Sequence, residues 1–193
     1  MAIEKIIVLY GGESSERSVS LESGKYIFQS VKNLGYEADL IDYPSEFLPE
    51  KFSQGDFVFI ALHGQDGESG GLQKFLQKNN IPYSGSGYEA CKITWNKDIF
   101  KNILREKRIP TPNWISVPSL HEFKGKLDDS IFDQFRPFNE IFLKPTEDGS
   151  SIDVFKLSSN HDLKKAIDDC LNSKRQFIFE ESIDFKELTV PIL

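Results

Sequence analysis

The residue best placed for chemistry in this sequence is a lysine at the end of a predicted strand. Lys144 follows the apolar run 140–143 and precedes Pro145 and the polar loop 146–151. Because proline has no N–H to donate to a sheet, we expect strand pairing to stop at Pro145. The N–H groups of such a loop can surround an anion, Gly149 permits a positive φ and a close backbone approach, and an ammonium group is a point charge for phosphate. The segment therefore indicates a phosphate-binding loop.

Two other interpretations of this loop exist beside the phosphate-binding one. Taken alone, the segment is more simply explained as a β-hairpin that carries a solvated lysine. A Walker A loop is excluded, because no G-x-x-x-x-G-K-[ST] pattern occurs in the chain. The rest of the sequence must decide between the phosphate site and the plain hairpin.

Composition is that of an ordinary globular protein of one or two domains. The 193 residues are 39% hydrophobic and 27% charged, with a formal net charge of −7. This charge argues against nucleic acid or a general membrane surface as partner. There is no signal-peptide pattern and no apolar run of membrane-spanning length, so we expect a cytoplasmic protein. Cys91 and Cys170 lack metal-site spacing and are expected to be reduced and buried.

The first half of the chain alternates strands with helices. Continuous apolar runs at 6–10 and 57–62 predict strands buried on both faces of a parallel sheet, with a third strand at 37–41. A helix capped by Ser14 or Ser15 separates the first two strands along the chain. The remaining predicted elements here are helices at 72–78 and around 88–94 and a short strand at 81–83. Together they predict a small three-layer α/β domain whose ligands bind at the carboxyl ends of the strands.

The second half reads as a sheet with fewer helices. The predicted helices span 97–107 with Asn96 as cap, 121–134 with an interruption at Gly125, and 160–171 with Asn160 as N-cap. The predicted strands are 114–117, 140–143, 152–157, 176–180 and the apolar start 189–193. No further segment is evident that would close a cleft against this layer. We therefore expect a fragment, with a borrowed partner surface as the alternative.

Taken together, the loops resemble those of the D-alanine–D-alanine ligase family, within the ATP-grasp superfamily. The matching motifs lie in the family's order along essentially the whole chain. They are 9–21 (LYGGESSERSVSL), 61–68 (ALHGQDGE), 82–87 (PYSGSG), Asn96-Lys97, 143–151 (LKPTEDGSS), and 179–181 (FEE) with 187–190 (ELTV). Each motif alone is weak, but their shared order and spacing are specific.

The resemblance implies both a fold and an activity. The fold is α/β, with an N-terminal Rossmann-like (pre-ATP-grasp) three-layer domain at 1–95 that binds substrate and an incomplete ATP-grasp α+β domain at 96–193, its C-terminal half absent. The activity is ATP-dependent joining of two D-alanines through an acyl phosphate, for peptidoglycan synthesis. ATP would be used with magnesium or manganese, whose ligands are expected outside this chain. A homodimer is a possible assembly, and no nucleic-acid or membrane partner is implied.

The resemblance also assigns residues to the nucleotide. Lys97 and Lys144 would bind the ATP phosphates as fixed cations. Glu180 would accept a hydrogen bond from the adenine amino group, and Glu187 would bind the ribose hydroxyls. The loop residues that would close over the phosphates and exclude water are Gly149, Ser150 and Ser151, with Asp148 before them.

Other residues are assigned to the amino-acid substrate. Glu16 would pair with the ammonium group of the first D-alanine, helped by Ser150, and these two are the expected catalytic residues. His63 would lie near the substrate carboxylate. Without the family, Glu16 is more simply a glutamate that stabilises a helix dipole, His63 a hydrogen-bonded loop histidine, and Glu187 a surface charge.

Departures from the family pattern keep a second hypothesis open. Ser69 replaces a carboxylate in the loop after His63, Asp153 stands where glycine is common, and Ser182 replaces a bulky aromatic. These favour a truncated or degenerate homologue that binds nucleotide without chemistry. We expect that the 193-residue chain alone does not turn over, because the missing part would carry the metal-binding residues. A nicotinamide-dependent dehydrogenase is set aside, since residues 11–16 are not G-x-G-x-x-G.

Overall fold

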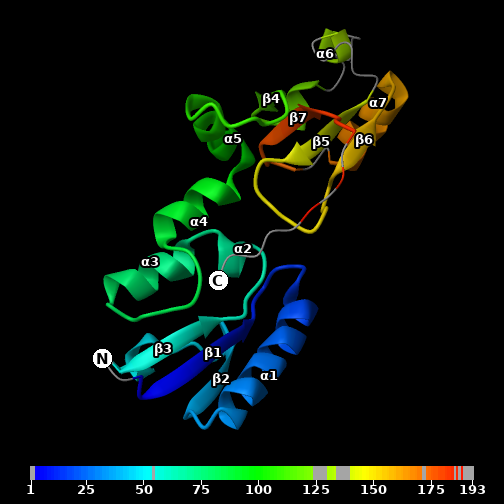
Figure 1. The fold of residues 1–193 in the computed structure, drawn as a ribbon. Coiled ribbons are helices and arrows are strands. Elements are labelled where there is room, and N and C mark those ends of the chain that lie inside the picture. Colours follow the sequence, from blue (N-terminus) through cyan, green and yellow to red (C-terminus); the bar gives the residue numbers. More distant parts are fainter. Residues whose placement is uncertain are drawn as a thin grey trace. The chain divides into compact units, whose positions relative to one another are not determined.

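The computed structural model describes residues 3–53, 55–123, 130–133, 140–170, 173–184, 186 and 188. The chain forms two compact units. The first comprises Met1–Asn96 and Asp148–Ser150, and the second Lys97–Glu147 and Ser151–Leu193 (Figure 1). Each unit is described by itself below.

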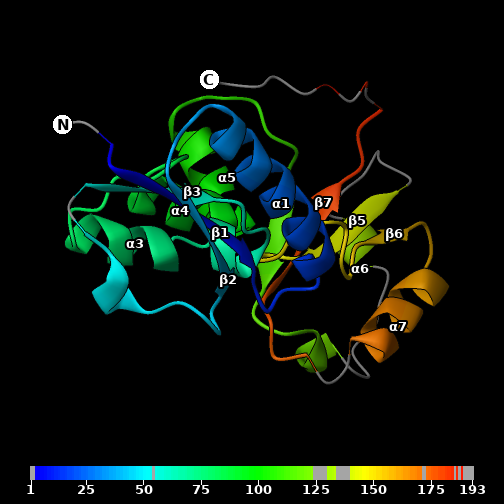
Figure 2. The same cartoon turned by 90° about the horizontal axis from the view of Figure 1, so that it is seen from below.

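The first unit is built on a parallel sheet in the order β2-β1-β3. The strands are β1 (Lys5–Gly11), β2 (Ala38–Tyr43) and β3 (Asp56–Ile60), and β1 pairs in parallel with both others. The helix α1 (Arg17–Asn33) connects β1 to β2 and runs beside the sheet (Figures 1 and 2). The further elements of this unit are the 3₁₀ turn η1 (Pro49–Lys51), α2 (Gln65–Glu68), α3 (Gly71–Lys78) and α4 (Tyr88–Trp95).

Alternate side chains of β1 pack on opposite faces of this sheet. Ile6 and Val8 belong to a core cluster with Val31 of α1, whereas Ile7 and Leu9 belong to another. The second cluster includes Leu72 and Leu76 of α3 and Ile81. A strand with apolar residues at every position is stable here because both faces are covered. The predicted three-layer α/β arrangement is confirmed.

The second unit contains an antiparallel sheet in the order β4-β7-β5-β6. The strands are β4 (Trp114–Val117), β5 (Ile141–Pro145), β6 (Phe155–Leu157) and β7 (Phe177–Glu181), and the helices are α5 (Lys97–Glu106), η2 (Leu120–Phe123), α6 (Ser130–Asp133) and α7 (Asn160–Asp169). One face of the sheet forms the core with α7. That core contains Val117, Leu120, Ile131, Ile141, Leu143, Leu157, Leu163, Ala166, Ile167, Cys170, Phe177 and Phe179.

Strand β5 ends at Pro145, where the sequence predicts the end of strand pairing, although Pro145 itself still lies in the ladder. Pro145 is the last residue of β5 and lies opposite Phe177. The next residue, Thr146, donates its N–H to the carbonyl of Gln176 at 2.9 Å. Hydrogen-bonded pairs alternate along an antiparallel ladder, so the nitrogen of Pro145 faces away from β7. On that side the pairing with β6 has already ended at Leu143, and no donor is required.

Two predicted helix caps are displaced by one or two residues. Glu16, and not Ser14 or Ser15, occupies the N-cap of α1, and it makes no side-chain cap bond. For α7 the N-cap is Ser159, whose side chain accepts from the N–H of Asp162 at 3.3 Å, and Asn160 is already helical. Serine is a better cap than asparagine here because its extended backbone brings the hydroxyl to that N–H.

Several smaller expectations have mixed outcomes. The predicted strand 81–83 appears only as an isolated parallel bridge between Val58 and Tyr83. Of the predicted helix 121–134, residues 124–129 and 134 lie outside the described part, as does the predicted strand 189–193. Both cysteines are free, but only Cys170 is buried, since Cys91 is partly exposed. No described helix is long and apolar enough to cross a membrane.

We predict that Leu9→Ala destabilises the first unit by about 3 kcal/mol, because the buried side chain leaves a cavity in the central strand. Leu9 has no exposed surface, whereas Leu34, just after α1, is 75% exposed. Leu34→Ala is therefore the matched control, with an expected change within about 0.5 kcal/mol. Chemical unfolding followed by circular dichroism measures both, and equal losses for the two variants would contradict the assignment of the core.

We predict a pH-dependent contribution from Asp162 at the start of α7. Hydrogen bonds to its carboxylate, from the Ser158 N–H first and then from the hydroxyls of Ser159 and Ser158, lower its pKa below the ordinary 3.8. The stability that the ionised Asp162 contributes is complete above pH 3.8, the pKa of the unfolded chain. It is lost as pH falls through the lower pKa of the folded protein, because the unfolded chain binds the proton first. Asp162→Asn should therefore lower the urea midpoint at about pH 7 and much less at about pH 3. Asp168→Asn, in the last turn, is the control and should not lower the urea midpoint at about pH 7, because a carboxylate there is not stabilised by the helix dipole.

Candidate functional site

The loop between β1 and α1 is fixed by an ion pair. Arg17 donates to the two carboxylate oxygens of Asp42 in β2, at 2.8 and 2.6 Å, and to the carbonyl of Gly12 at 3.0 Å. The hydrogen bond from Arg17 holds the pKa of the Asp42 carboxyl below its usual value. A Cβ on Gly11, whose φ is +88°, would lie 2.2 Å from Asp42 Oδ1, so only glycine fits. The pair thereby fixes the first turn of α1 and Glu16 beside it.

A buried serine ties α1 to the ends of two strands. The Ser20 hydroxyl accepts from the N–H of Gly11 at 2.9 Å and donates to the carbonyl of Ala61 at 2.7 Å. Gly11 ends β1, and Ala61 directly follows β3. The sequence-based reasoning missed Ser20. The signal available was a small polar residue on the buried side of a helix that follows a glycine turn.

The structure brings Glu16 and His63 to the same cluster of loops. A Cβ on Gly64 would lie 3.0 Å from Glu16 Oε2, so the carboxylate of Glu16 lies against the backbone next to His63. The ring Nε2 of His63 lies 3.2 Å from the Ser23 hydroxyl, and its carbonyl accepts from the Ser14 hydroxyl at 3.0 Å. A carboxylate and an imidazole thus both lie at the carboxyl edge of the parallel sheet.

The glycine-rich loop after His63 is internally hydrogen-bonded despite Ser69. Glu68 accepts from the N–H of Gly64 at 3.0 Å, and Asp66 accepts from the N–H of Glu13 at 2.6 Å. Although Ser69 replaces a carboxylate, Glu68 bonds within this loop and Asp66 connects it to the loop between β1 and α1. The loop also contains the short helix α2, which the sequence did not predict.

The segment after β5 takes left-handed backbone conformations at positions other than the glycine. Positive φ occurs at Asp148 (118°), Ser150 (50°) and Ser151 (59°), and not at Gly149. The prediction that Gly149 supplies the positive φ is wrong, since short polar residues, which tolerate this region better than bulky ones, adopt it instead. Residues 148–150 group with the first unit, where the Ser150 hydroxyl donates to the carboxylate of Glu16.

The exit of this loop is fixed by a second ion pair. Asp153 has φ of 50°, a conformation in which glycine is the easiest residue. Its carboxylate pairs with Arg175, whose guanidinium lies 5.7 Å from the Phe177 ring centre. The turn that glycine would permit is kept here by an aspartate with a cationic partner.

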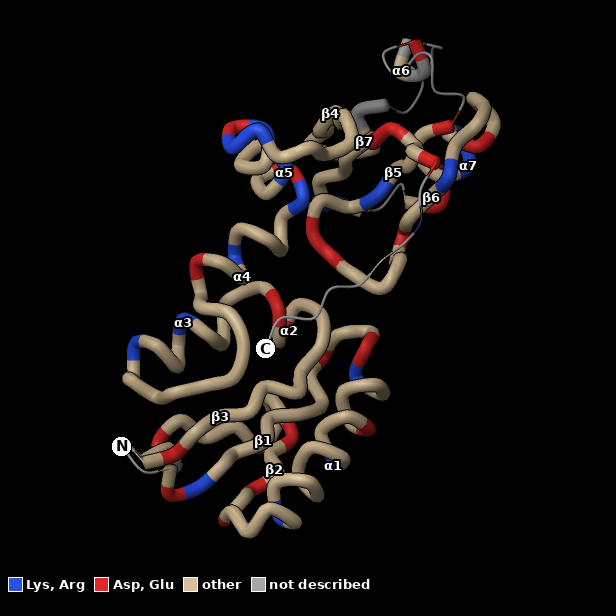
Figure 3. Tube along the Cα trace, viewed as in Figure 1, with Lys and Arg blue, Asp and Glu red and all other residues tan. Residues whose placement is uncertain are grey.

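In the second unit, a glutamate on β7 lies between two lysines. Glu180 Oε1 accepts from Lys144 on β5, and Glu180 Oε2 lies 2.6 Å from the Nζ of Lys101 on α5. Lys144 pairs opposite Ile178, two residues from Glu180, so both side chains project from the same face of the sheet. Figure 3 shows the basic residues of α5 as blue segments of the tube. The predicted nucleotide residues Lys144 and Glu180 are thus in direct contact.

Lys97 lies next to the same strand end. Its backbone N–H donates to the carbonyl of Thr146 at 2.8 Å, and its Nζ is 3.5 Å from that oxygen. The start of α5 is therefore attached two residues beyond Lys144. Glu187, the residue predicted to bind ribose, lies outside the described residues.

Lys101 is the residue in this cluster that sequence reasoning missed. It lies one helical turn after Lys97, and like charges at that spacing repel when no anion lies between them. Two lysines one turn apart on α5 were therefore the available signal. The anion that Lys101 contacts, Glu180, is 79 positions away, and no local pattern identifies it.

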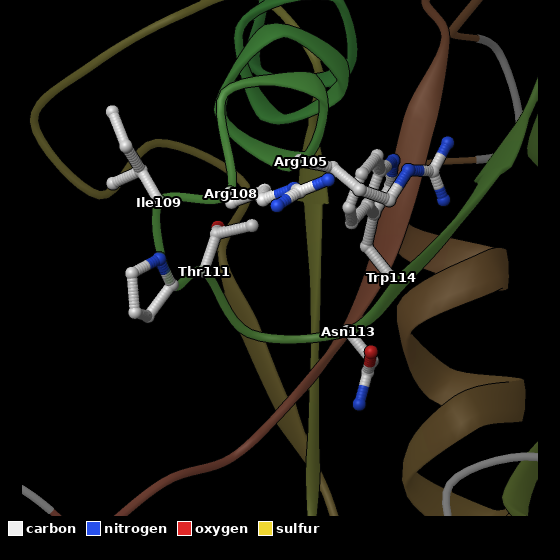
Figure 4. Close-up of a pocket in the computed structure, with 7 residues that line it drawn as sticks. Arg105, Arg108, Ile109, Thr111, Asn113 and Trp114 are labelled. Carbon is white, nitrogen blue, oxygen red and sulfur yellow. The ribbon is translucent and has the colours of Figure 1, made fainter.

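A surface pocket of about 300 Å³ adjoins the cluster. Its lining includes Arg105, Arg108, Thr111 and Trp114 (Figure 4). The guanidinium of Arg105 lies 4.8 Å from the Trp114 ring centre. Thr111 and Trp114 also contact Lys101, so the pocket shares one wall with the lysine cluster.

That the magnesium or manganese ligands lie outside this chain stays a prediction. Within the part of the chain that the structure describes, no group of three or more His, Cys, Asp or Glu side chains could hold a metal.

The chain is similar to D-alanine–D-alanine ligases. A family model described as the D-ala D-ala ligase C-terminus matches residues 103–193. A D-alanine–D-alanine ligase B of Clostridium perfringens is 35% identical over 189 residues, which are 97% of this chain and 61% of that protein. A D-alanine–D-alanine ligase of Francisella philomiragia is 37% identical over 195 residues, which are 100% of this chain and 62% of that protein.

Solved structures agree with the sequence matches. The D-alanine–D-alanine ligase from Bacillus anthracis matches with a TM-score of 0.79 and 31% identity, over 93% of this chain and 58% of that one. The structure of that ligase complexed with ATP matches with a TM-score of 0.78 and 30% identity, over 94% and 59%. The chain has the mixed α/β architecture of these ATP-grasp proteins. It is related to the D-alanine–D-alanine ligases, as its motifs indicated, and spans about three fifths of the length of the curated relatives it matches.

We predict that Lys101→Met lowers the free energy of unfolding by about 3 kcal/mol, because Glu180 loses a buried partner. The Lys101 side chain is 7% exposed and that of Glu180 is 12% exposed. The surface pair Lys156–Glu140, 54% and 43% exposed, supplies the control. Lys156→Met should cost less than about 1 kcal/mol in the same urea titration. A loss no larger than that of the control would show that the buried pair does not stabilise the second unit.

Proposed function

We propose that this protein works as a D-alanine–D-alanine ligase. ATP transfers its terminal phosphoryl group to the carboxylate of one D-alanine. The amine of a second D-alanine then attacks the acyl phosphate, so that a peptide bond forms and phosphate leaves, with ADP as the other product. The dipeptide would serve peptidoglycan synthesis in the cytoplasm. The observation that carries the proposal is the contact between Lys144 and Glu180 in a chain similar over nearly its whole length to these ligases.

The residues of the second unit would bind the nucleotide. Lys97 and Lys144 are cations near one strand end and suit the negative charge of the triphosphate. Glu180 would accept a hydrogen bond from the adenine amino group, and Glu187 would bind the ribose hydroxyls. Their charges would stabilise phosphoryl transfer, for which positioning and electrostatics supply most of the catalysis.

The residues of the first unit would bind the first D-alanine. Glu16, fixed beside the Arg17–Asp42 pair, has the charge to hold the substrate ammonium group, and Ser150 would assist it. His63 would donate to the substrate carboxylate. The loop containing Gly149, Ser150 and Ser151 would exclude water from the acyl phosphate, which water would otherwise hydrolyse.

We predict that Lys144→Met lowers kcat/KM for ATP about 100-fold, because a phosphate-binding cation is removed. The prediction applies to the protein in the form that its native cells produce. Phosphate release with ATP, magnesium and D-alanine measures this. Lys156→Met is the control, since it removes a lysine of the same sheet that pairs only with surface Glu140. If the unmodified protein binds ATP but releases no phosphate, the degenerate nucleotide-binding homologue replaces the ligase. The 193-residue chain alone is proposed not to turn over, and clear phosphate release by it would overturn that part.

We predict that Glu16→Gln raises KM for the first D-alanine about 10- to 100-fold and leaves KM for ATP nearly unchanged, because it removes the charge opposite the ammonium group. Glu13→Gln, three residues earlier in the same loop, is the matched control. Initial rates at varied D-alanine and fixed ATP separate the two effects. Equal KM values for the two variants would remove Glu16 from the substrate site.

A further inference from the structure

Lys101 is buried where a lysine is usually exposed. Its side chain on α5 is 7% exposed, against 21% for Lys144 and 54% for Lys156. A buried ammonium group is unfavourable unless its hydrogen-bonding capacity is met. The surroundings of Lys101 therefore indicate a residue held for a particular contact.

Three groups hold the ammonium of Lys101 in place. Its Nζ lies 2.6 Å from Glu180 Oε2 and 2.7 Å from the hydroxyl of Thr111. It also lies 5.1 Å from the centre of the Trp114 ring, where the negative face of the indole attracts a cation. The Trp114 indole N–H donates to Asp98 at 2.7 Å, so the ring itself is fixed to α5. Lys101 thus has one position, set by α5 and β4 together.

The two lysines on Glu180 are not equivalent. Lys101 occupies Oε2 from the buried side, and the less buried Lys144 occupies Oε1. Lys144 has a proposed role at the phosphates, whereas Lys101 is enclosed by Thr111 and Trp114. Lys101 is therefore the more enclosed partner of Glu180, and Oε1 is the oxygen that a ligand can take when Lys144 contacts the phosphates.

We propose that Lys101 is a positioning residue for nucleobase selection. It holds the carboxylate of Glu180 in the orientation in which Oε1 accepts a hydrogen bond from the 6-amino group of adenine. The inference rests on the proposed function, in which Glu180 contacts the base. Lys101 itself does not touch the nucleotide.

A merely structural lysine would behave differently from a positioning one. Loss of a purely stabilising contact lowers the affinity for every nucleotide by the same factor. Loss of a positioned acceptor lowers the affinity for ATP more than for ITP, whose base has a carbonyl oxygen where adenine has the amino group. That oxygen cannot donate, and it is repelled by a fixed carboxylate. The ratio of ATP to ITP affinity is therefore the readout.

The experiment measures ATP and ITP binding by isothermal titration calorimetry, with the protein in the form that its native cells produce. The variants are Glu180→Gln, Lys101→Met and the milder Thr111→Val, and Lys156→Met is the control. We expect the unmodified protein to prefer ATP, and Lys101→Met to lower this preference about tenfold, the scale of one hydrogen bond to a charged group. Thr111→Val should lower it less but in the same direction, and it serves if Lys101→Met does not fold. Lys156→Met should leave it unchanged.

The outcomes separate the two levels of the proposal. A preference that falls in Glu180→Gln but stays unchanged in Lys101→Met and Thr111→Val overturns the positioning role alone. Equal losses of ATP and ITP affinity in Lys101→Met also overturn it. A preference unchanged in Glu180→Gln removes Glu180 from the base site, and absence of ATP binding by the unmodified protein overturns the proposed function itself.

Discussion

The second unit depends on one shared carboxylate. Glu180 on β7 forms ion pairs with Lys101 of α5 and with Lys144 of β5, so three elements meet at one side chain. Ionised groups with so little exposure are stable together only because each has its counter-charge and hydrogen bonds. The apolar core of this unit lies on the other face of the sheet, beneath α7. One face of the sheet therefore packs the apolar core, and the other face carries the charged cluster.

In the first unit, polar groups at the strand ends are stabilised mainly by hydrogen bonds to backbone atoms. Its polar contacts gather where β1, β2 and β3 end, because parallel strands leave their last carbonyls and N–H groups at one edge. Ser20 satisfies two of those groups, and the Arg17–Asp42 pair spans the gap between α1 and β2. Neither contact needs a ligand to be stable. Glu16 is the N-cap residue directly before Arg17. It can therefore be held in place before any substrate arrives.

The layers were predictable from the sequence, whereas the details at the ends of the elements were not. Apolar runs such as 6–10 are long enough to define buried strands, and 114–117 was predicted with the bounds that the structure has. The caps at Glu16 and Ser159, the paired position of Pro145 and the positive φ of Ser150 depend on where the chain turns in space. Lys97, Lys144 and Glu180 were found because each lies in a short motif of neighbouring residues. Lys101 escaped because its partner lies far along the chain, and burial of a charge cannot be read from a helical pattern.

The departures from the family pattern bear on whether this chain retains chemistry. A degenerate protein accumulates losses that nothing nearby offsets. Here the loop containing Ser69 is still bonded through Glu68 and Asp66, and Asp153 keeps a left-handed turn while pairing with Arg175. A buried two-lysine cluster on Glu180 is costly to maintain, since it stabilises no better than apolar packing of the same volume. Its presence therefore favours a site kept for a charged ligand, which the ligase and a nucleotide-binding homologue without chemistry would both require.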